Sequence, residues 1–206
     1  GLVMVDSKLF LELVEDKSSK AKVKHIIEKH HSYVASSSSV GRRIDWLVYH
    51  KDYTNILGVE KPIGMIGIGS SVYPCPKAIL NYLSMKADEY KKPNHFNTIA
   101  NNWRFCMTES IKNAGTQILK QLRQRAPAEW KNKYGDDLTH IITFVAGGNN
   151  GAVYKADNWK LIGETAGLAK DRKSFSVKWS SAEYLKETFL PPTGEDKKLI
   201  FIKELN

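Results

Sequence analysis

Residues 101–126, NNWRFCMTESIKNAGTQILKQLRQRA, combine the patterns of a strand, a loop and a helix. Apolar side chains alternate with other residues over 103–108, which is typical of a strand. Apolar residues then recur every four positions from Ala114 to Ala126, which predicts one buried face of a helix. The polar stretch 109–115 joins the two patterns. The segment therefore predicts a strand that leads through a loop into a long helix.

The loop between this strand and helix has the features of a phosphate site. At a helix start the first backbone N–H groups lack intrahelical acceptors, and the helix dipole is positive there. We therefore expect Lys112, Asn113, Gly115 and Thr116 to bind a phosphate-bearing cofactor. The alternative is an ordinary strand-to-helix turn, in which Asn113 and Thr116 only cap the helix.

The composition is that of a folded, basic, single domain. Of the 206 residues, 42% are hydrophobic, which is enough to bury a core. Lys and Arg number 31 against 22 Asp and Glu, so the formal net charge is +9 at pH 7. Such an excess favours an acidic partner, for example nucleic acid or a coenzyme phosphate. Cys75 and Cys106 lack the spacing of a metal site, so we predict two reduced thiols and no metal ligands.

The hydropathy pattern predicts no membrane partner. No apolar run approaches the roughly 18 residues that a membrane-spanning helix requires. The short apolar stretch at the start of the sequence is followed at once by Asp6 and Lys8, unlike a secretion signal. We therefore expect a cytoplasmic location.

The remaining patterns alternate between helix and strand. Helices are predicted at residues 7–33 with a break at 16–19, and at 77–90, 114–126, 127–134 and 152–158. Strands are predicted at residues 44–49, 59–70, 103–108, 139–145, 159–164, 174–179 and 199–202. This order indicates an α/β (α+β) fold with a mixed central sheet flanked by helices. We expect one domain over residues 1–206, with an N-terminal helical segment over about residues 1–30.

Three glycines lie inside the second predicted strand, at positions 64, 67 and 69. No helix follows them directly, as it would in a phosphate-binding loop. Glycines inside a strand mark a close backbone approach or a bulge. We prefer that interpretation here.

The predicted order of elements resembles the acyl-CoA N-acyltransferase (GNAT) fold. In that family a strand–loop–helix unit holds the coenzyme A pyrophosphate with a Q/R-x-x-G-x-G/A signature. Residues 112–117, KNAGTQ, occupy the matching positions, with lysine first and glutamine in place of the last small residue. The resemblance implies an acyl-CoA or a related thioester as cofactor.

A longer resemblance covers roughly residues 26–170. It rests on HHSY at 30–33, NWRF at 102–105, NAGT at 113–116, TFV at 143–145 and GAVYKADNW at 151–159. These strings resemble the phage Mom-like proteins, a GNAT branch that modifies adenine in DNA. They also resemble a related uncharacterised family found in anti-phage defence islands and beside transposases. For a phage-encoded protein, the cytoplasm would be that of the host cell.

The resemblance implies roles for individual residues. Tyr154 corresponds to the tyrosine that protonates the leaving thiolate in GNAT enzymes, and Arg104 would hold a base or a phosphate in the same pocket. Relatives carry an aspartate after T-F-V, where this chain has Ala146, so its role would pass to Asp157 or Glu164 or be lost. The residues expected to contact DNA or the target base are His31, Tyr33, Lys120, Arg123, Asn158 and Trp159.

Structural roles are the alternatives for these residues. Tyr154 would then anchor a short helix in the core. Arg104 would form an internal salt bridge to Glu109 or Glu164, since an unpaired charge among apolar neighbours is costly. Trp159 would pack in the core, and the basic side chains would be solvated surface.

Three hypotheses for function follow. The first is a Mom-like enzyme that transfers a small acyl-derived group to a nucleobase amino group in DNA, with adenine as the expected base, flipped out of the duplex. The second is a non-catalytic DNA-binding module of a phage-defence or transposition system. The third is an N-acyltransferase of a small metabolite. The basic charge favours the DNA hypotheses, and the altered pyrophosphate signature favours the non-catalytic one.

Overall fold

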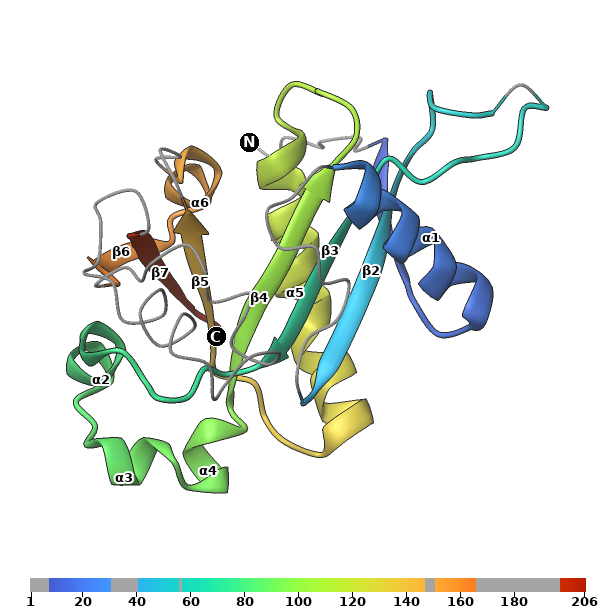
Figure 1. Ribbon diagram of the computed structural model, residues 1–206. Helices are drawn as coiled ribbons and strands as arrows, with labels where there is room; N and C mark the ends of the chain where they lie inside the picture. The colour runs from blue at the N-terminus through green and yellow to red at the C-terminus, as the bar shows by residue number, and fades with distance from the viewer. Residues whose placement is uncertain (1–7, 31–40, 56, 147–150, 166–196) are drawn as a thin grey trace, which may run out of the picture.

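The computed structural model describes residues 8–30, 41–55, 57–146, 151–165 and 197–206. The strands in these residues are β1 Leu9–Leu13, β2 Arg43–His50, β3 Gly64–Ser70, β4 Ile99–Met107, β5 His140–Ala146, β6 Lys160–Glu164 and β7 Lys198–Glu204. They form one mixed sheet in the order β1-β2-β3-β4-β5-β7-β6 (Figure 1). Neighbouring strands pair antiparallel except β4 and β5, which are parallel. The predicted α/β class with a mixed central sheet is confirmed.

Helices cover both faces of this sheet. They are α1 Lys17–Lys29, α2 Lys77–Leu83, α3 Ala87–Tyr90, α4 Pro93–Phe96, α5 Ala114–Tyr134 and α6 Ala152–Ala156. Helix α1 lies across β2, β3 and β4 on one face, and α5 lies behind β1 and β2 on the other (Figure 1). None of the helices in the described residues combines the length and the apolar content that a membrane crossing requires.

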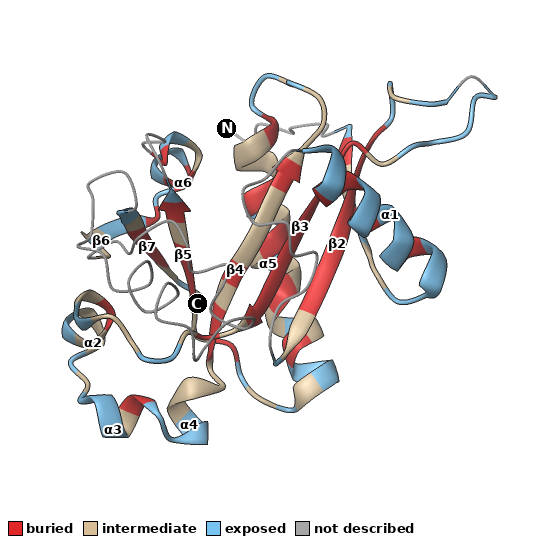
Figure 2. Ribbon diagram, in the orientation of Figure 1, coloured by how far each residue is buried: buried red, intermediate tan, exposed pale blue. Residues whose placement is uncertain are grey.

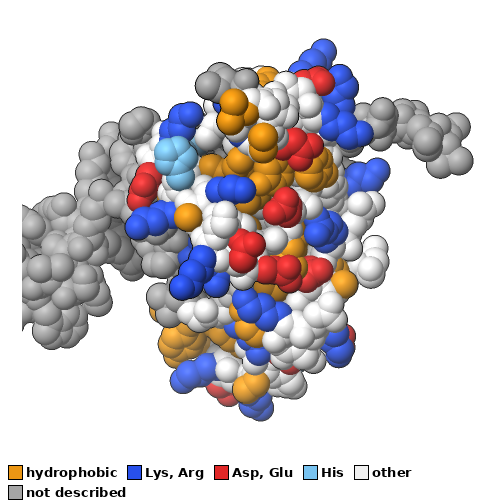
Figure 3. Space-filling view, turned by 90° about the vertical axis from the view of Figure 1, so that its right-hand side faces the viewer, with side chains coloured by type: hydrophobic (Ala, Val, Ile, Leu, Met, Phe, Trp, Pro, Cys, Tyr) orange, Lys and Arg blue, Asp and Glu red, His pale blue; other side chains and the backbone are white. Residues whose placement is uncertain are grey.

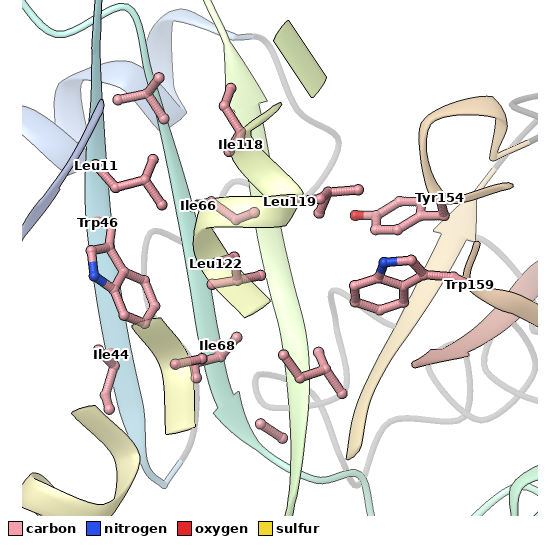
Figure 4. Packing of buried hydrophobic residues seen from close by; sticks show 14 of the residues in the cluster. Leu11, Ile44, Trp46, Ile66, Ile68, Ile118, Leu119, Leu122, Tyr154 and Trp159 are labelled. Carbon is pink, nitrogen blue, oxygen red and sulfur yellow. The ribbon is translucent and has the colours of Figure 1, made fainter. Parts of the chain in front are cut away.

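The largest part of the core lies between α5 and the sheet. The four-residue repeat of α5 predicted from the sequence buries Ile118, Leu122 and Ala126 completely. These side chains pack against Trp46 of β2 and Ile66 of β3 (Figure 4). The central strands are accordingly buried along most of their length (Figure 2).

A smaller cluster lies on the opposite face, under α1. Val23 and Ile26 of α1 pack there against Leu47 of β2 and Met65 of β3. The helix begins at a capping box, in which the Asp16 side chain accepts from the third residue of the helix. The predicted second half of the N-terminal helical segment is thereby confirmed.

The helix prediction for the first half of that segment is wrong, because residues 9–13 form the edge strand β1. Leu9 and Leu11 are buried on the α5 face, whereas Phe10 stacks on Tyr49 on the α1 face, with ring centroids 5.3 Å apart. Glu12 is the one exposed residue of the strand, so its sequence shows little alternation. The apolar residues at 9, 10, 13 and 14 also fit one face of a helix.

Other element boundaries also differ from the prediction. Helix α5 runs on through Pro127 to Gly135, whose φ of 80° makes it the expected glycine cap. The helix predicted at 77–90 breaks at Ser84, which has a φ of 52°. Helix α4, at Pro93–Phe96, lies in a stretch for which no helix is predicted. Strand β3 begins at residue 64 and not at 59. The strand predicted at 174–179 lies outside the described residues.

The glycines of β3 serve close packing, as the strand pattern indicated. A Cβ added at Gly67 would overlap the Asp45 carboxylate and the Trp103 indole. The register between β3 and β4 also shifts between Gly67 and Gly69, which places a bulge on β4. The preferred interpretation of these glycines is confirmed.

Side chains of α5 bind the outer edge of β1. Residues 8 and 14 hydrogen-bond to the β2 side, so the backbone of Leu9 and Leu11 points outward. The Gln121 side chain accepts from Leu11 N at 3.2 Å and donates to Leu9 O at 2.8 Å. Arg125 donates to the Leu11 carbonyl from the next turn of the helix. This pairing holds the edge strand against the helix.

We expect Gln121→Ala to lower the free energy of unfolding by about 1 to 3 kcal/mol, because it removes two partly buried hydrogen bonds. Urea denaturation followed by circular dichroism measures the change. The control is Gln124→Ala, since Gln124 is exposed on the same helix. Equal stability of the two variants would contradict this role of Gln121.

Candidate functional site

Strands β4 and β5 diverge in the middle of the sheet. Their parallel register includes only three pairs, from Ile99 opposite His140 to Asn101 opposite Ile142. Strand β4 then continues to Met107 and β5 to Ala146, and Figure 1 shows the two strands separating. Beyond the third pair, the facing backbone edges of these two strands are not paired with each other.

The Asn102 side chain lies where the pairing ends. Its Nδ2 donates to Gly67 O on β3 at 2.8 Å and to Arg104 O at 3.1 Å. Its Oδ1 accepts from the Tyr154 hydroxyl at 2.7 Å. The Thr143 hydroxyl of β5 donates to the Asn102 backbone carbonyl at 3.2 Å. Side chains from β4, β5 and α6 thus meet at the point of divergence.

Tyr154 is held rigidly at this point. Helix α6 starts after Gly151, which has a left-handed φ of 69° and lies close against the Phe201 ring of β7. The Tyr154 ring contacts Trp159 with centroids 5.0 Å apart and stacks on Phe201 with centroids 5.8 Å apart. Only 7% of the residue is exposed (Figure 4).

Burial moves the pKa of Tyr154 further above the neutral range. Loss of solvent around the phenol raises its pKa to about 12, because the charged phenolate is disfavoured there. The hydroxyl is therefore protonated throughout the neutral range. Tyr154 can act as a hydrogen-bond donor or as a general acid, and it also anchors α6 in the core. The functional and structural interpretations of this residue both fit its position.

The start of α5 has open backbone donors. Asn113 precedes the helix with a φ of 61° and makes no side-chain cap. The Thr116 hydroxyl bonds only to the Asn113 carbonyl, at 3.2 Å. Within the described part of the chain, no acceptor faces the N–H groups of Gly115 and Thr116. Lys112 and Asn113 are exposed beside these N–H groups. An anion fits this set of donors.

Gly115 has a second role at this position. A Cβ added there would overlap the Val153 side chain of α6. The first turn of α5 therefore approaches α6 as closely as a glycine permits. The open donors of α5 and the helix that carries Tyr154 are in direct contact as a result.

Arg104 lies on the other face of the sheet from Tyr154. Arg104 is paired with Gly67 on β3, and paired residues point to the same face of the sheet. A Cβ added at Gly67 would point at Asp45 and Trp103, which marks that face. The Arg104 guanidinium carbon is 5.7 Å from the centroid of the Trp103 ring, which packs with the α1 cluster. Tyr154 belongs to the α5 cluster. The structure therefore does not bring Tyr154 and Arg104 into one pocket.

Asp157 forms a buried ion pair with Arg123 of α5. Its carboxylate accepts from Arg123 Nε at 2.8 Å and Nη2 at 2.7 Å, and from Trp159 Nε1 at 2.8 Å. The arrangement ties α5 to the segment after α6. The guanidinium of Arg123 is directed inward to Asp157, and Trp159 is buried. Trp159 thus packs in the core, as its structural alternative had it, whereas Arg123 is paired with Asp157 and not left as solvated surface.

The other predicted site residues lie apart from this network. Lys120 is exposed on α5, and Asn158 is exposed in a left-handed turn with a φ of 61°. Asn158 O accepts from Lys203 Nζ at 3.4 Å. His31 and Tyr33 lie outside the described residues. Within the described residues, no group of three His, Cys, Asp or Glu side chains is placed to hold a metal ion.

Asn102 and Thr143 were missed as site residues by the sequence analysis. Both lie inside strings used for the resemblance, but neither was given a role. A polar side chain in a buried strand was the available signal, because such a group must find partners inside the protein. Asn102 is 4% exposed and Thr143 is 2% exposed.

The structure is similar to solved N-acetyltransferases. NAA60 of Arabidopsis thaliana in complex with acetyl-CoA superposes with a TM-score of 0.58 at 14% identity, covering 96% of this chain and 99% of that one. The polyamine N-acetyltransferase of Drosophila melanogaster gives 0.52 at 10% identity, covering 96% and 100%. The fold is that of the GNAT acetyltransferases. An agmatine N-acetyltransferase also gives 0.52, at 12% identity with 96% and 100% covered. No family model and no curated protein sequence matches the chain.

We expect Asp157→Ala to lower the free energy of unfolding by about 1 to 3 kcal/mol, because it leaves the Arg123 guanidinium and the Trp159 N–H without their acceptor. The estimate allows for the partial exposure of Arg123, where solvent screens the pair. Arg123→Ala and the double variant complete a thermodynamic cycle. Losses that simply add in the double variant would contradict direct coupling of the pair.

Proposed function

We propose that the protein is an N-acyltransferase that takes an acyl group from an acyl-CoA thioester and transfers it to the amino group of a small molecule. The main support is the placement of Tyr154. Its hydroxyl is held by Asn102 at the divergence of β4 and β5, and like any phenol it is protonated at neutral pH. A proton donor at this point of a GNAT fold suits a reaction whose leaving group is a thiolate.

The start of α5 would hold the cofactor. The N–H groups of Gly115 and Thr116, with Lys112 beside them, would bind the pyrophosphate. When bound, the thioester supplies an activated acyl group. Tyr154, oriented by its hydrogen bond to Asn102, would release that bond and donate its hydroxyl proton to the departing sulfur, and the proton lost from the attacking amine would restore the phenol. The contact of Gly115 with Val153 keeps the phosphate donors and Tyr154 at a fixed separation.

An amine acceptor is supported by the proteins that share this fold. The solved structures of similar fold include N-acetyltransferases of agmatine and of polyamines. Both substrates are small amines. We therefore place free amines first among acceptors.

Transfer to a nucleobase amino group in DNA, as in Mom-like proteins, is the second candidate. The net charge of +9 favours it. Two observations weigh against it. The guanidinium of Arg123 is bound to Asp157, and the face shown in Figure 3 mixes Lys and Arg with Asp and Glu. A surface of mixed charge gives little attraction for a phosphate backbone.

We expect the protein to bind coenzyme A and to release its thiol from acetyl-CoA in the presence of an amine acceptor. Calorimetry measures binding, and a thiol reagent measures release. Acceptors to compare are agmatine, spermidine, a peptide with a free N-terminus, and duplex and single-stranded DNA. Mass spectrometry of the peptide and of nucleosides identifies the acylated atom. Absence of coenzyme A binding, or of thiol release with every acceptor, would overturn the proposal.

We further expect Tyr154→Phe to reduce kcat about 100-fold while the Kd for coenzyme A stays unchanged, because only the proton donor is removed. Tyr82→Phe, in a half-buried position on α2, is the control. Thermal unfolding of both variants separates loss of the bond to Asn102 from loss of catalysis. Unchanged kcat in Tyr154→Phe would limit Tyr154 to its structural role.

A further inference from the structure

A hollow of about 480 Å³ lies between α1 and the segment that leads into β3. Lys22, His25 and Lys29 line it from α1, and Lys61 lines it from the opposite wall. It is separate from the divergence of β4 and β5, because neither Tyr154 nor Asn102 lines it. Figure 1 shows the two elements that form its walls, α1 and the long connection between β2 and β3.

The spacing along α1 places three of these basic side chains on one side of the helix. Positions 22, 25 and 29 are three and four residues apart, so their side chains lie above one another. Lys61 faces them from the other wall. Two separate segments of the chain therefore direct positive or protonatable groups into one hollow.

The lining of the hollow is basic and contains no acidic side chain. No salt bridge of the described residues involves Lys22, His25, Lys29 or Lys61. Elsewhere, the described residues pair Lys8, Arg42, Arg43, Arg123, Lys131 and Lys197 with Asp or Glu. The basic groups that line the hollow are therefore not neutralised by an ion pair of the described residues.

Acidic groups near the hollow lie outside its lining. Glu12 and Glu60 act on the Tyr49 hydroxyl, whose pKa is raised mainly by burial, and Lys22 lies beside the same hydroxyl. Neither glutamate lines the hollow. Like charges gathered without counter-charges repel one another, and a bound anion relieves that repulsion.

The size and remaining walls indicate what kind of anion fits. A volume of about 480 Å³ exceeds what a lone phosphate needs and lies in the range of small-molecule sites. Ala21, Ile26 and Pro62 supply an apolar part of the lining, and Thr108 closes one side. Lysines suit a phosphate, and the apolar wall suits a flat ring.

We propose that this hollow binds a phosphate ester of mononucleotide size, at a site distinct from the acyl-transfer site. The phosphate would contact Lys22, Lys29 and Lys61, and the base would lie against Pro62 and Ile26. A free nucleotide and a nucleotide within a single strand share this chemistry. The inference does not depend on the proposed acyl transfer, because it rests on other residues.

The test uses the full chain and ADP carrying a fluorescent group on its ribose. Binding is titrated at 50 mM salt and again at 300 mM, where attraction to phosphate weakens. We expect Lys22→Gln/Lys29→Gln/Lys61→Gln to weaken binding at least tenfold. The control is Lys20→Gln/Lys24→Gln/Lys51→Gln, which removes the same charge from exposed residues of the same segments that do not line the hollow. Thermal unfolding establishes that both triple variants are folded.

A third variant separates this site from the start of α5, which is also expected to bind phosphate. Lys112→Gln should leave the binding of labelled ADP at the hollow unchanged. Competition by pyrophosphate and ADP, but not by adenosine, supports phosphate recognition. Competition by an eight-residue thymidine oligonucleotide identifies a nucleic-acid strand as the source, and failure of that competition identifies a free nucleotide. Equal affinity of the two triple variants, no binding at 50 mM salt, or loss of binding in Lys112→Gln would overturn the proposal.

Discussion

A single buried amide, that of Asn102, sets the geometry at the centre of this protein. Its side chain bonds to β3, to its own strand β4 and to the Tyr154 hydroxyl on α6, and its backbone carbonyl accepts from Thr143 on β5. A buried amide left unpaired costs about 1 to 3 kcal/mol. The three strands and α6 must therefore be in place together. The divergence of β4 and β5 is a fixed feature of the fold for this reason.

The same network explains why the two faces of β4 differ. The bulge opposite Gly67 and Gly69 lets Asn102 face α5, while Trp103 faces the α1 cluster. Tyr154 therefore meets the strand from one side only. The polar groups on the other side, Arg104 and Asp45 among them, form a separate environment in which burial raises the pKa of the Asp45 carboxyl. The side chains that meet at the divergence of β4 and β5 are therefore few, namely Asn102, Thr143 and Tyr154.

Much of the fold was predictable from the sequence, because local patterns determine it. The four-residue repeat predicts the buried face of α5, and the glycines predict close packing on β3. The structure confirms both predictions. Strand β1 was not predictable in this way, since its apolar residues also fit one face of a helix. It is a strand because it pairs with β2, which lies about forty residues further along the chain, and Gln121 binds its outer edge. The local sequence does not reveal these distant partners.

The candidate site was predictable only in part, for a related reason. The residues proposed to bind phosphate at the start of α5 lie within one short segment, so they appear together in sequence. The partners of Tyr154 come from distant strands, and the face of β4 to which each residue points depends on the bulge. Arg104 was expected beside Tyr154. The bulge adds one residue to β4, and one extra residue reverses the face of the sheet to which the following side chains point, so Arg104 lies across the sheet from Tyr154.

The α5 side chains that bind the outer edge of β1 also affect how copies of this protein meet. An uncovered edge strand offers free N–H and C=O groups to any extended segment of another molecule, which is a common route to aggregation. Here Gln121 and Arg125 already occupy the outward groups of Leu9 and Leu11. A second chain would have to displace them before it could add a strand at this edge. At β1 the sheet therefore ends in an edge that is already hydrogen-bonded, and a strand from another molecule cannot pair with it directly.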